Sequence, residues 1–379
     1  MAYQVSTRTS YGNRLSESLK GVVTGFIMFI AGTVLLFWNE GNFVKTRKSI
    51  AEAQGVVVRV DDVSTINPEL NGKLIHATAF ADTQDMLEDE MFGVNERAIA
   101  LNREVEYYQY VESSKTETRD RIGGGQEKIT TYEYELKWVS QPVNSSNFQD
   151  PTYRSVNFVQ KNVESRKLQA QNVSFGGYKL PSFMVSSISG NAPVEVNVTP
   201  EEEVQVFGNT VYYGPSSNNP QVGDVRVTIT KVVPTNISII GKVFNNTFEQ
   251  YVAKNGKSFS KVSMGEVSAD NMFAEAHSAN SMWTWILRIV GILVVVMGLK
   301  SLFGILPALF KVLPFLGNIV GAGVGLVCVV GGGAWSLLVI SLAWLFYRPL
   351  VGIPLLVLSV LGIWYLSKKA KAKKGGEKV

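Results

Sequence analysis

Long apolar runs with at most one charged residue each lie near both ends of the chain, and the segment between them alternates apolar with polar residues. The first run occupies 21–38, and three more follow late in the chain, at 283–299, 315–347 and 350–366. A helix of about 20 apolar residues crosses the roughly 30 Å hydrocarbon core of a membrane. The pattern therefore predicts four transmembrane helices.

The segment 39–267 reads as a mainly β domain. Tyr132, Tyr134, Leu136 and Trp138 alternate with charged residues, as in a strand with one buried face. Three consecutive glycines in the polar stretch before them predict the tip of a long hairpin. We predict strands at 55–63, 73–80, 104–111, 132–138, 194–198, 204–213, 225–233 and 237–244, after a short helix at 45–54.

The fold class that follows is an α+β membrane protein with four transmembrane helices and a large mainly-β extracytoplasmic domain inserted between helices 1 and 2. The connecting helix before the second span starts at Ser268, whose side chain suits an N-cap. Whether 315–347 forms one helix or a pair broken at its glycine triplet stays open.

The boundaries are a loosely ordered cytoplasmic segment 1–20, helix 1 at 21–38, the β domain 39–267, the connecting helix 268–282, helix 2 at 283–299, an interfacial cytoplasmic segment 300–314, helix 3 at 315–347, helix 4 at 350–366 and a basic cytoplasmic tail 367–379.

Charge and cysteine content narrow this picture. The net charge is only +4, and lysines and arginines concentrate at the two chain ends. Basic residues flank membrane spans on the cytoplasmic side, which predicts that both termini are cytoplasmic. A nucleic-acid patch is the rival reading, but both clusters adjoin spans, so we expect a lipid bilayer and no nucleic acid as partner. Cys328 is the single cysteine, so the exported domain holds itself without an intrachain disulfide.

Catalytic signals are weak. His76 and His277 are the two histidines, far apart in the sequence, and no recognisable spacing supplies carboxylate partners for a metal site. The chain also lacks the common zinc-protease and serine-hydrolase motifs. We therefore predict no catalytic residue, no cofactor and no metal.

Small and aromatic residues in the spans predict packing and membrane anchoring. Gly317, Gly321 and Gly325 are four residues apart and share one helix face, as in contacts where two helix backbones approach closely. Three tryptophans, Trp38, Trp283 and Trp285, lie at predicted span ends, where indole rings anchor helices at the interface.

Three charged residues fall near the predicted outer interface: Glu40, Arg288 and Arg348. Charges at this depth are costly unless they extend to the headgroups or pair with each other. One interpretation is that each reaches the interface separately. The other is that Glu40 pairs with one of the arginines and determines how the spans meet the domain, without the sequence deciding which arginine.

Several motifs run in order along the chain: Asn39-Glu40-Gly41 with Lys45-Thr46, Phe92-Gly93-Val94, Leu101 to Glu112, Asn144 to Phe148, Val222 to Val227, Asn280 to Arg288 and Trp344 to Leu350. Together they resemble the transmembrane protein 43 (LUMA) family. The resemblance extends from about residue 15 to 366, and it departs from the family where Glu88–Gly93 lacks a proline and where 153–157 lacks a histidine.

The resemblance implies a four-span protein with a large domain between spans one and two. Animal members of the family sit in the endoplasmic reticulum and inner nuclear membrane, self-associate, and are linked to lamins and emerin. Prokaryotic relatives have no nuclear envelope, so lamina binding is not assumed for this chain. The short loops and the disulfide-free domain favour a bacterial member in its cell membrane.

The function expected from all this is a non-enzymatic, self-associating membrane scaffold that organises membrane proteins or lipids. A channel or transport component is the first alternative, although the span cores contain only scattered serine and threonine. A cell-envelope enzyme is the second alternative. It would need carboxylates such as Glu104, Glu106 and Glu112 to meet other acid or base groups in three dimensions.

Overall fold

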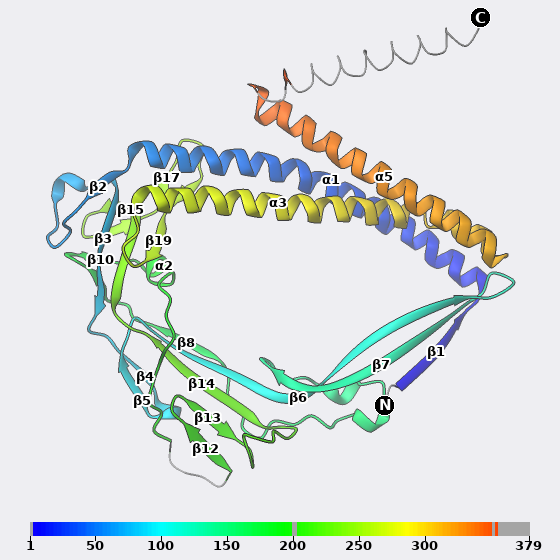
Figure 1. Ribbon diagram of the computed structural model, residues 1–379, viewed down its shortest axis with the longest axis horizontal. Coiled ribbons are helices and arrows are strands. Elements are labelled where there is room, and N and C mark those ends of the chain that lie inside the picture. Colours follow the sequence, from blue (N-terminus) through cyan, green and yellow to red (C-terminus); the bar gives the residue numbers. More distant parts are fainter. Residues whose placement is uncertain (1–2, 199–202, 351–352, 355–379) are drawn as a thin grey trace, which may run out of the picture. The chain divides into compact units, whose positions relative to one another are not determined.

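The computed structural model describes residues 3–198, 203–350 and 353–354, and it divides into two compact units (Figure 1). The sheet unit comprises residues 3–7, Ser49–Glu117 and Lys128–Glu275. The helix unit comprises Arg8–Lys48, Thr118–Glu127 and the described residues from Ala276 onward. Two long helices and a long hairpin contribute residues to both units.

Three helices are long and apolar enough to cross a membrane within the described part of the chain: α1, the α3–α4 segment and α5. The predicted fourth span, 350–366, and the tail, 367–379, lie almost wholly outside the described residues. The helices are α1 (Tyr11–Val56), α2 (Ser182–Val185), α3 (Ala269–Leu302), α4 (Ile305–Phe310) and α5 (Pro314–Tyr347).

Helix α1 extends well beyond the predicted span 21–38. Its 46 residues absorb the separate helix predicted at 45–54 and the start of the strand predicted at 55–63. The prediction that 1–20 is loosely ordered is also wrong, because a strand occupies Tyr3–Thr9 and α1 begins at Tyr11. No proline interrupts 11–56, so polar residues beyond the apolar run continue the same hydrogen-bonded helix.

Helices α3 and α5 are each continuous. The Ser268 hydroxyl accepts a hydrogen bond from the Asn271 N–H at 3.3 Å, which is the capping interaction expected at the start of α3. Helix α5 passes through its glycine triplet without a break. Each glycine costs about 1 kcal/mol of helix stability, but an unpaired backbone group in hydrocarbon costs several. Proline at its first turn marks its start.

An eight-stranded sheet has the order β1-β7-β6-β14-β13-β12, with β8 pairing β6 and β11 pairing β14. Its long hairpin β6–β7 carries left-handed glycines at its tip, with φ of 90° at Gly123 and 84° at Gly124. The strands are β1 (Tyr3–Thr9), β6 (Ala100–Asp120), β7 (Gln126–Val139), β8 (Arg166–Gln169), β11 (Ala192–Pro193), β12 (Val204–Phe207), β13 (Thr210–Tyr213) and β14 (Val225–Val232).

A seven-stranded sheet has the order β19-β15-β16-β10-β9-β3-β2, with a further pairing of β15 with β3. Two small hairpins, β4–β5 and β17–β18, complete the described strands. The strands are β2 (Val58–Val60), β3 (Leu74–Thr83), β4 (Met86–Asp89), β5 (Val94–Arg97), β9 (Val173–Phe175), β10 (Tyr178–Lys179), β15 (Thr235–Phe244), β16 (Thr247–Glu249), β17 (Tyr251–Val252), β18 (Ser258–Phe259) and β19 (Lys261–Met264).

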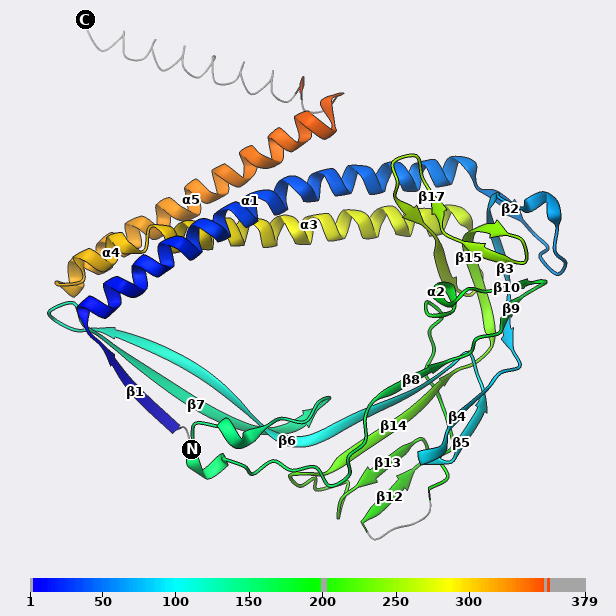
Figure 2. The ribbon, with the colours of Figure 1, turned by 180° about the vertical axis from the view of Figure 1, so that it is seen from behind.

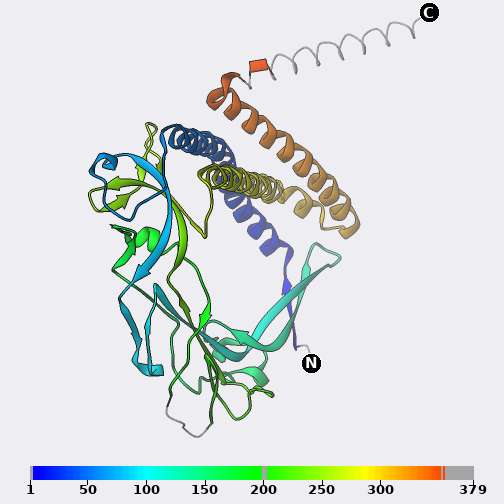
Figure 3. The same cartoon turned by 60° about the vertical axis from the view of Figure 1, so that its left-hand side comes forward.

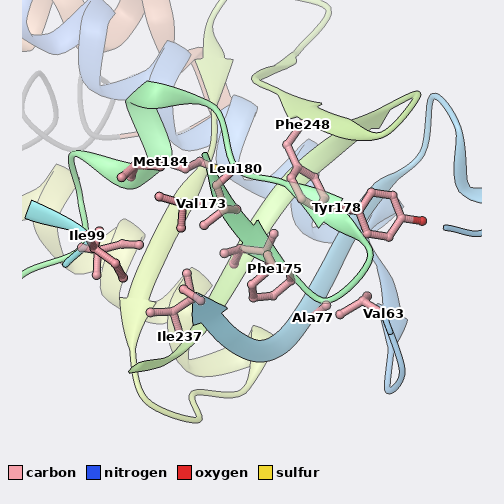
Figure 4. Packing of buried hydrophobic residues seen from close by; sticks show 14 of the residues in the cluster. Val63, Ala77, Ile99, Val173, Phe175, Tyr178, Leu180, Met184, Ile237 and Phe248 are labelled. Atoms are coloured by element: carbon pink, nitrogen blue, oxygen red, sulfur yellow. The ribbon is translucent and has the colours of Figure 1, made fainter. Parts of the chain in front are cut away.

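Two apolar clusters form the cores of the sheet unit. In the first, aromatic and aliphatic side chains from β3, β9, β10, α2, β15 and β16 converge, among them Phe175, Tyr178 and Phe248 (Figure 4). The second lies on the eight-stranded sheet and includes Val105, Val225 and Val227. This burial is what allows the domain to fold with a single cysteine in the chain.

Several strand predictions need correction. Segment 204–213 is a hairpin, β12–β13, because Gly208 takes a left-handed φ of 60° and turns the chain. The predicted strand 194–198 is not one, since β11 ends at Pro193. Strand β6 is 21 residues long, far longer than the apolar part at 104–111. The half of β6 nearest the hairpin tip is polar and exposed, so apolar and polar residues do not alternate there and the sequence pattern does not identify it as a strand.

Candidate functional site

Helices α1 and α3 pack antiparallel through glycines within the helix unit, and both views from the front and back show them side by side (Figure 2). A Cβ added to Gly25 would lie 2.5 Å from the Leu302 nitrogen and 2.6 Å from the Gly298 oxygen. One added to Gly32 would lie 2.8 Å from a Val295 methyl carbon. The backbones therefore touch, and no side chain fits at Gly25 without separating the helices.

The same contact has a second pair of glycines on α3. An added Cβ at Gly298 would meet the Phe29 nitrogen at 2.6 Å, and one at Gly291 would meet the Leu36 side chain at 2.6 Å. The pairs on both helices are seven residues apart, which keeps small residues on one face over two turns. Sequence reasoning missed this spacing because it looked for glycines four residues apart.

Helix α5 joins this pair through another small residue. A Cβ at Gly332 would lie 2.9 Å from a Val296 methyl carbon and 3.2 Å from a Leu299 methyl carbon. Ser336, one turn later, is buried and its hydroxyl donates to the Gly332 carbonyl at 2.7 Å. The seam continues through buried Val339, Ile340 and Ala343.

The three glycines singled out from the sequence lie elsewhere on α5. A Cβ at Gly317 would contact the Lys311 side chain at 2.4 Å, and one at Gly321 would reach Pro307 of α4 at 3.6 Å. Gly325 has nothing within 4 Å among the described residues. Gly317 and Gly321 therefore face the short α4 segment, and the proposed three-glycine packing face stays a prediction.

Glu40 lies where α1, α3 and α5 meet, and its side chain is buried. Its two oxygens accept hydrogen bonds from Arg288 Nε at 2.5 Å and Arg288 Nη2 at 2.8 Å. The Trp344 indole N–H of α5 donates to the same carboxylate at 2.9 Å. The carboxylate is 1% and the Arg288 side chain 11% exposed, so this is a buried, bidentate ion pair.

The neighbours of Glu40 on α1 also contact the other helices. The Asn39 amide donates to the Thr284 carbonyl of α3 at 3.0 Å. A Cβ on Gly41 would lie 2.6 Å from the Tyr347 ring, so only glycine lets α5 come this close. Each residue of the Asn39-Glu40-Gly41 motif thus makes a contact with α3 or α5. The partners Trp344, Tyr347 and Thr284 had no signal in the sequence beyond their place in the resemblance.

Arg348, just past the end of α5, does not pair with Glu40. Its guanidinium lies over the Phe43 ring at 4.4 Å and near Trp344 at 5.5 Å. Its Nη2 atom is buried and has no hydrogen-bond partner among the described residues. Of the two arginines that the sequence left open, Arg288 is the ion-pair partner. We call Glu40, Arg288, Trp344 and Arg348 the Glu40 cluster.

A cavity of about 200 Å³ adjoins the Glu40 cluster. Both arginines and two tryptophans, Trp285 and Trp344, contribute to its wall. Its lining residues are Phe43, Ser281, Thr284, Trp285, Arg288, Trp344 and Arg348. The site therefore combines positive charge, aromatic surface and empty volume.

The predicted interfacial tryptophans are exposed in the helix unit. Trp38, Trp283 and Trp285 are 54%, 59% and 60% exposed, and their role as membrane anchors stays a prediction. Trp285 has a second role, because the Arg288 guanidinium lies 4.6 Å from its ring centroid. The ring thereby covers one face of the buried cation.

A second charged cluster lies at the other end of the same helices. Asp120, at the tip of hairpin β6–β7, accepts hydrogen bonds from Arg14 of α1 and from Lys311 after α4. The Gly123 N–H also donates to the Val312 carbonyl at 3.1 Å. We call Asp120, Arg14 and Lys311 the Asp120 cluster. Sequence reasoning missed it, because nothing in a polar hairpin tip identifies a distant partner.

Other candidate groups serve structural contacts. His76 makes a 2.8 Å hydrogen bond to the Val267 carbonyl, and His277 is half-buried, with a pKa lowered by burial and by nearby Arg47. Glu106 pairs with Arg226 at 2.5 Å, and Glu112 accepts from the Tyr134 hydroxyl at 2.7 Å. No three His, Cys, Asp or Glu residues gather around a possible metal site in the described part of the chain.

Comparisons with known proteins agree with the sequence resemblance. The family model described as Transmembrane protein 43 matches residues 107–349. Human transmembrane protein 43 is 29% identical, covering 98% of this chain and 95% of its own. The rat protein is 31% identical over 89% of this chain and 87% of its own, and a Drosophila melanogaster homolog is 26% identical over 90% and 94%.

No solved structure matches. The matched region contains Arg288, Trp344 and Arg348, and the human alignment spans nearly the whole length of both proteins. With three long apolar helices and a large sheet-rich segment among its described residues, the chain belongs to the transmembrane protein 43 family of membrane proteins.

Proposed function

We propose that this protein is a non-enzymatic membrane scaffold that self-associates and organises membrane proteins or lipids. The observation that carries the proposal is the Glu40 cluster, where one buried carboxylate binds groups from two other helices. A buried ion pair is strongly destabilised when one partner is removed, so it favours the single arrangement that satisfies both charges. A fixed arrangement of spans suits a protein that holds others in place.

The contacts of the polar groups within the spans support a scaffold over an ion path through one chain. The hydroxyls of Thr24, Thr33 and Ser301 donate to helix carbonyls at 3.3, 2.8 and 2.8 Å. Ser336 bonds in the same way. These groups stabilise helix backbone and helix contacts instead of lining a water path. A pore between copies, or an envelope enzyme, is the alternative.

Our proposal keeps four spans, with 350–366 as the fourth and both termini cytoplasmic. The membrane is the cell membrane in a bacterium, and the endoplasmic reticulum or inner nuclear membrane in a eukaryote. This topology puts 39–267 on the side opposite Arg14 and Lys311. It therefore requires the hairpin tip to separate from both residues in a bilayer, and the Asp120 cluster is the observation against it.

Labelling of the tip decides between these arrangements. Ile122 is 90% exposed, so Ile122→Cys in a Cys328→Ser background gives a reactive thiol at the tip. An impermeant maleimide should label it from the extracytoplasmic side of sealed membranes, with Glu69→Cys as the matched control in the sheet unit. Labelling of Ile122→Cys only from the side of the N-terminus would overturn the topology.

The scaffold itself is tested by purifying the full chain in mild detergent and measuring its mass with its bound proteins and lipids. We expect a mass above one copy, with partners retained by the wild type and by Glu17→Gln, a substitution of an exposed carboxylate on α1. Glu40→Gln should lose them. A monodisperse single copy without protein or lipid would contradict the proposal, and ion conductance in bilayers would favour the channel.

A further inference from the structure

The charges of the Glu40 cluster do not balance. Two guanidinium groups and one carboxylate leave one positive charge in excess, and Arg47 adds to the positive potential that acts on Arg348. Glu40 already satisfies Arg288 with two hydrogen bonds. The excess charge therefore belongs to Arg348, which lies against two rings and forms no ion pair with Glu40 among the described residues.

The unpaired nitrogen of Arg348 is a strong donor without an acceptor. Leaving a buried charged donor unsatisfied costs more than the roughly 1–3 kcal/mol typical of a neutral group. Among the described residues Arg348 Nη2 has no hydrogen-bond partner, but it has almost no accessible surface and does not itself face the cavity. Other atoms of Arg348 line the cavity, so a negatively charged group there would lie beside the guanidinium and neutralise its charge.

The cavity has the size and chemistry for such a group. Its volume of about 200 Å³ is several times the roughly 30 Å³ that one water occupies, so a tetrahedral oxyanion fits. Arginine matches phosphate oxygens with its planar fork of donors, which a lysine does not. The hydroxyl-bearing Ser281 and Thr284 lie on the same wall, and Trp285 and Trp344 present apolar rings.

We propose that this cavity binds a phosphate-bearing anion of single charge, held by Arg348 with Arg288 beside it. Two sources share this chemistry: the phosphodiester of a membrane phospholipid and free inorganic phosphate. The exposed Trp285 beside the cavity and the apolar helices around it suit the headgroup of a lipid. The inference does not depend on the scaffold function, because a channel or enzyme could hold the same anion.

The first experiment measures bound phospholipid on the full chain. The protein is purified in mild detergent, exchanged repeatedly into lipid-free detergent, and analysed by native mass spectrometry, then titrated with phosphatidylglycerol. We expect wild type to retain one phospholipid and Arg348→Gln to bind it roughly tenfold or more weakly, as for loss of a charged hydrogen bond. Lys20→Gln is the matched control, since it removes one positive charge near the opposite end of α1.

A second variant keeps the test sound if Arg348→Gln fails to fold. Ser281→Leu fills the cavity from the α3 wall and leaves both arginines in place. It should lower lipid retention while the elution profile and circular dichroism match wild type. Arg348→Lys keeps the charge but loses the fork, and it should bind with intermediate affinity.

A second arm distinguishes the sources. Inorganic phosphate alone is added to delipidated protein, and thermal unfolding is recorded for wild type and Arg348→Gln. Lipid retained through exchange and lost in Arg348→Gln assigns the site to a headgroup. A phosphate-dependent rise in Tm only for wild type, without retained lipid, assigns it to the free ion. Equal lipid retention and equal phosphate response in wild type, Arg348→Gln and Ser281→Leu would overturn the proposal.

Discussion

The two ends of the helix unit carry clusters with the same number of charged groups but with different hydrogen bonding. Each has one carboxylate and two basic side chains, and α1, the blue helix in Figure 3, contributes one residue to each cluster. In the Asp120 cluster both basic groups bond the carboxylate, whereas in the Glu40 cluster Arg288 bonds both carboxylate oxygens and Arg348 bonds neither. Arg14 and Glu40 are 26 residues apart on α1, about 39 Å along a helix.

The difference shows that pairing geometry, more than charge count, decides what a cluster can do. Asp120 accepts hydrogen bonds from both cations, and each cation also bonds a second group, the Gly124 carbonyl for Arg14 and the Asn318 side chain for Lys311. Glu40 is turned so that its two oxygens match the fork of one guanidinium, and Arg348 is left facing a cavity. The Asp120 cluster therefore serves as a structural contact, whereas the Glu40 cluster leaves Arg348 able to bind a ligand in the cavity.

The largest expected effect is at Glu40. Glu40→Gln leaves the Arg288 guanidinium buried without its counter-charge, and breaking a buried pair in this way costs about 3–5 kcal/mol. Thermal unfolding of the full chain in detergent should show a large drop in Tm. Glu17→Gln, on the same helix, serves as control and should unfold like wild type. A Tm for Glu40→Gln equal to that control would mean the pair contributes nothing to stability.

The next effect lies between the two ends, at the α1–α3 contact. Gly25→Ala places a methyl group 2.5 Å from backbone nitrogen, and overpacking of this kind costs about 1–3 kcal/mol. Gly323→Ala is the matched control, because nothing lies within 4 Å of its Cβ position and alanine favours helix. Unfolding midpoints should fall for Gly25→Ala and stay equal or rise for Gly323→Ala. The reverse order would show that the two helices do not touch there.

A smaller effect is expected at Asp120 in detergent, where no bilayer separates the hairpin tip from Arg14 and Lys311. Its side chain is 14% exposed, so Asp120→Asn should cost about 1–2 kcal/mol, less than the change at Glu40. The loss should be local, and hydrogen exchange of the Gly123 amide, which donates to Val312, should speed up. Lys115→Gln, an exposed change on the same hairpin, should leave that exchange rate unaltered. An unchanged exchange rate of the Gly123 amide in Asp120→Asn would show that the contact at the hairpin tip does not depend on this carboxylate.

The smallest expected effect is a pH dependence confined to the Asp120 cluster. Partial burial raises the pKa of Asp120, but hydrogen bonds from Lys311 and Arg14 outweigh it and hold the pKa below its ordinary value of 3.8. A carboxyl with a lowered folded-state pKa contributes stability above its unfolded pKa, and this is lost as the pH falls through the folded pKa. The protection of the Gly123 amide against hydrogen exchange, corrected for the intrinsic exchange rate, should be unchanged near pH 5 and should decline below about pH 4. Asp120→Asn should show no such decline.

Periodicity and apolar runs predicted much of the fold because they report burial directly. The three long helices, the β-rich middle and the glycine-tipped hairpin all carry such a signal. The extra length of α1 and the polar half of β6 do not, because exposed residues continue an element through backbone hydrogen bonds alone. The hairpin at 204–213 was missed because one Gly turns an otherwise continuous β pattern.

The charged residues of the candidate site could be predicted from the sequence, but the pairs that they form could not. Depth in the membrane singled out Glu40, Arg288 and Arg348, since charges there need compensation. The choice of Arg288 depends on the antiparallel register of α1 and α3, which the glycine contacts set. The orphaned nitrogen of Arg348 depends on where α5 ends beside Phe43. Neither the register of α1 against α3 nor the position of Arg348 beside Phe43 can be obtained from the residue pattern of one sequence.

The separation of the ion-pair partners along the chain has a consequence for biosynthesis. Arg288 follows Glu40 by 248 residues, and Trp344 follows it by 304. At about 5–20 residues per second, the ribosome needs roughly 12–50 s to reach Arg288 after making Glu40. The first span is therefore inserted with an uncompensated acid at its end, which has to stay hydrated or protonated until the second span arrives. Assembly of the helices is in this way tied to completion of the whole sheet-forming segment.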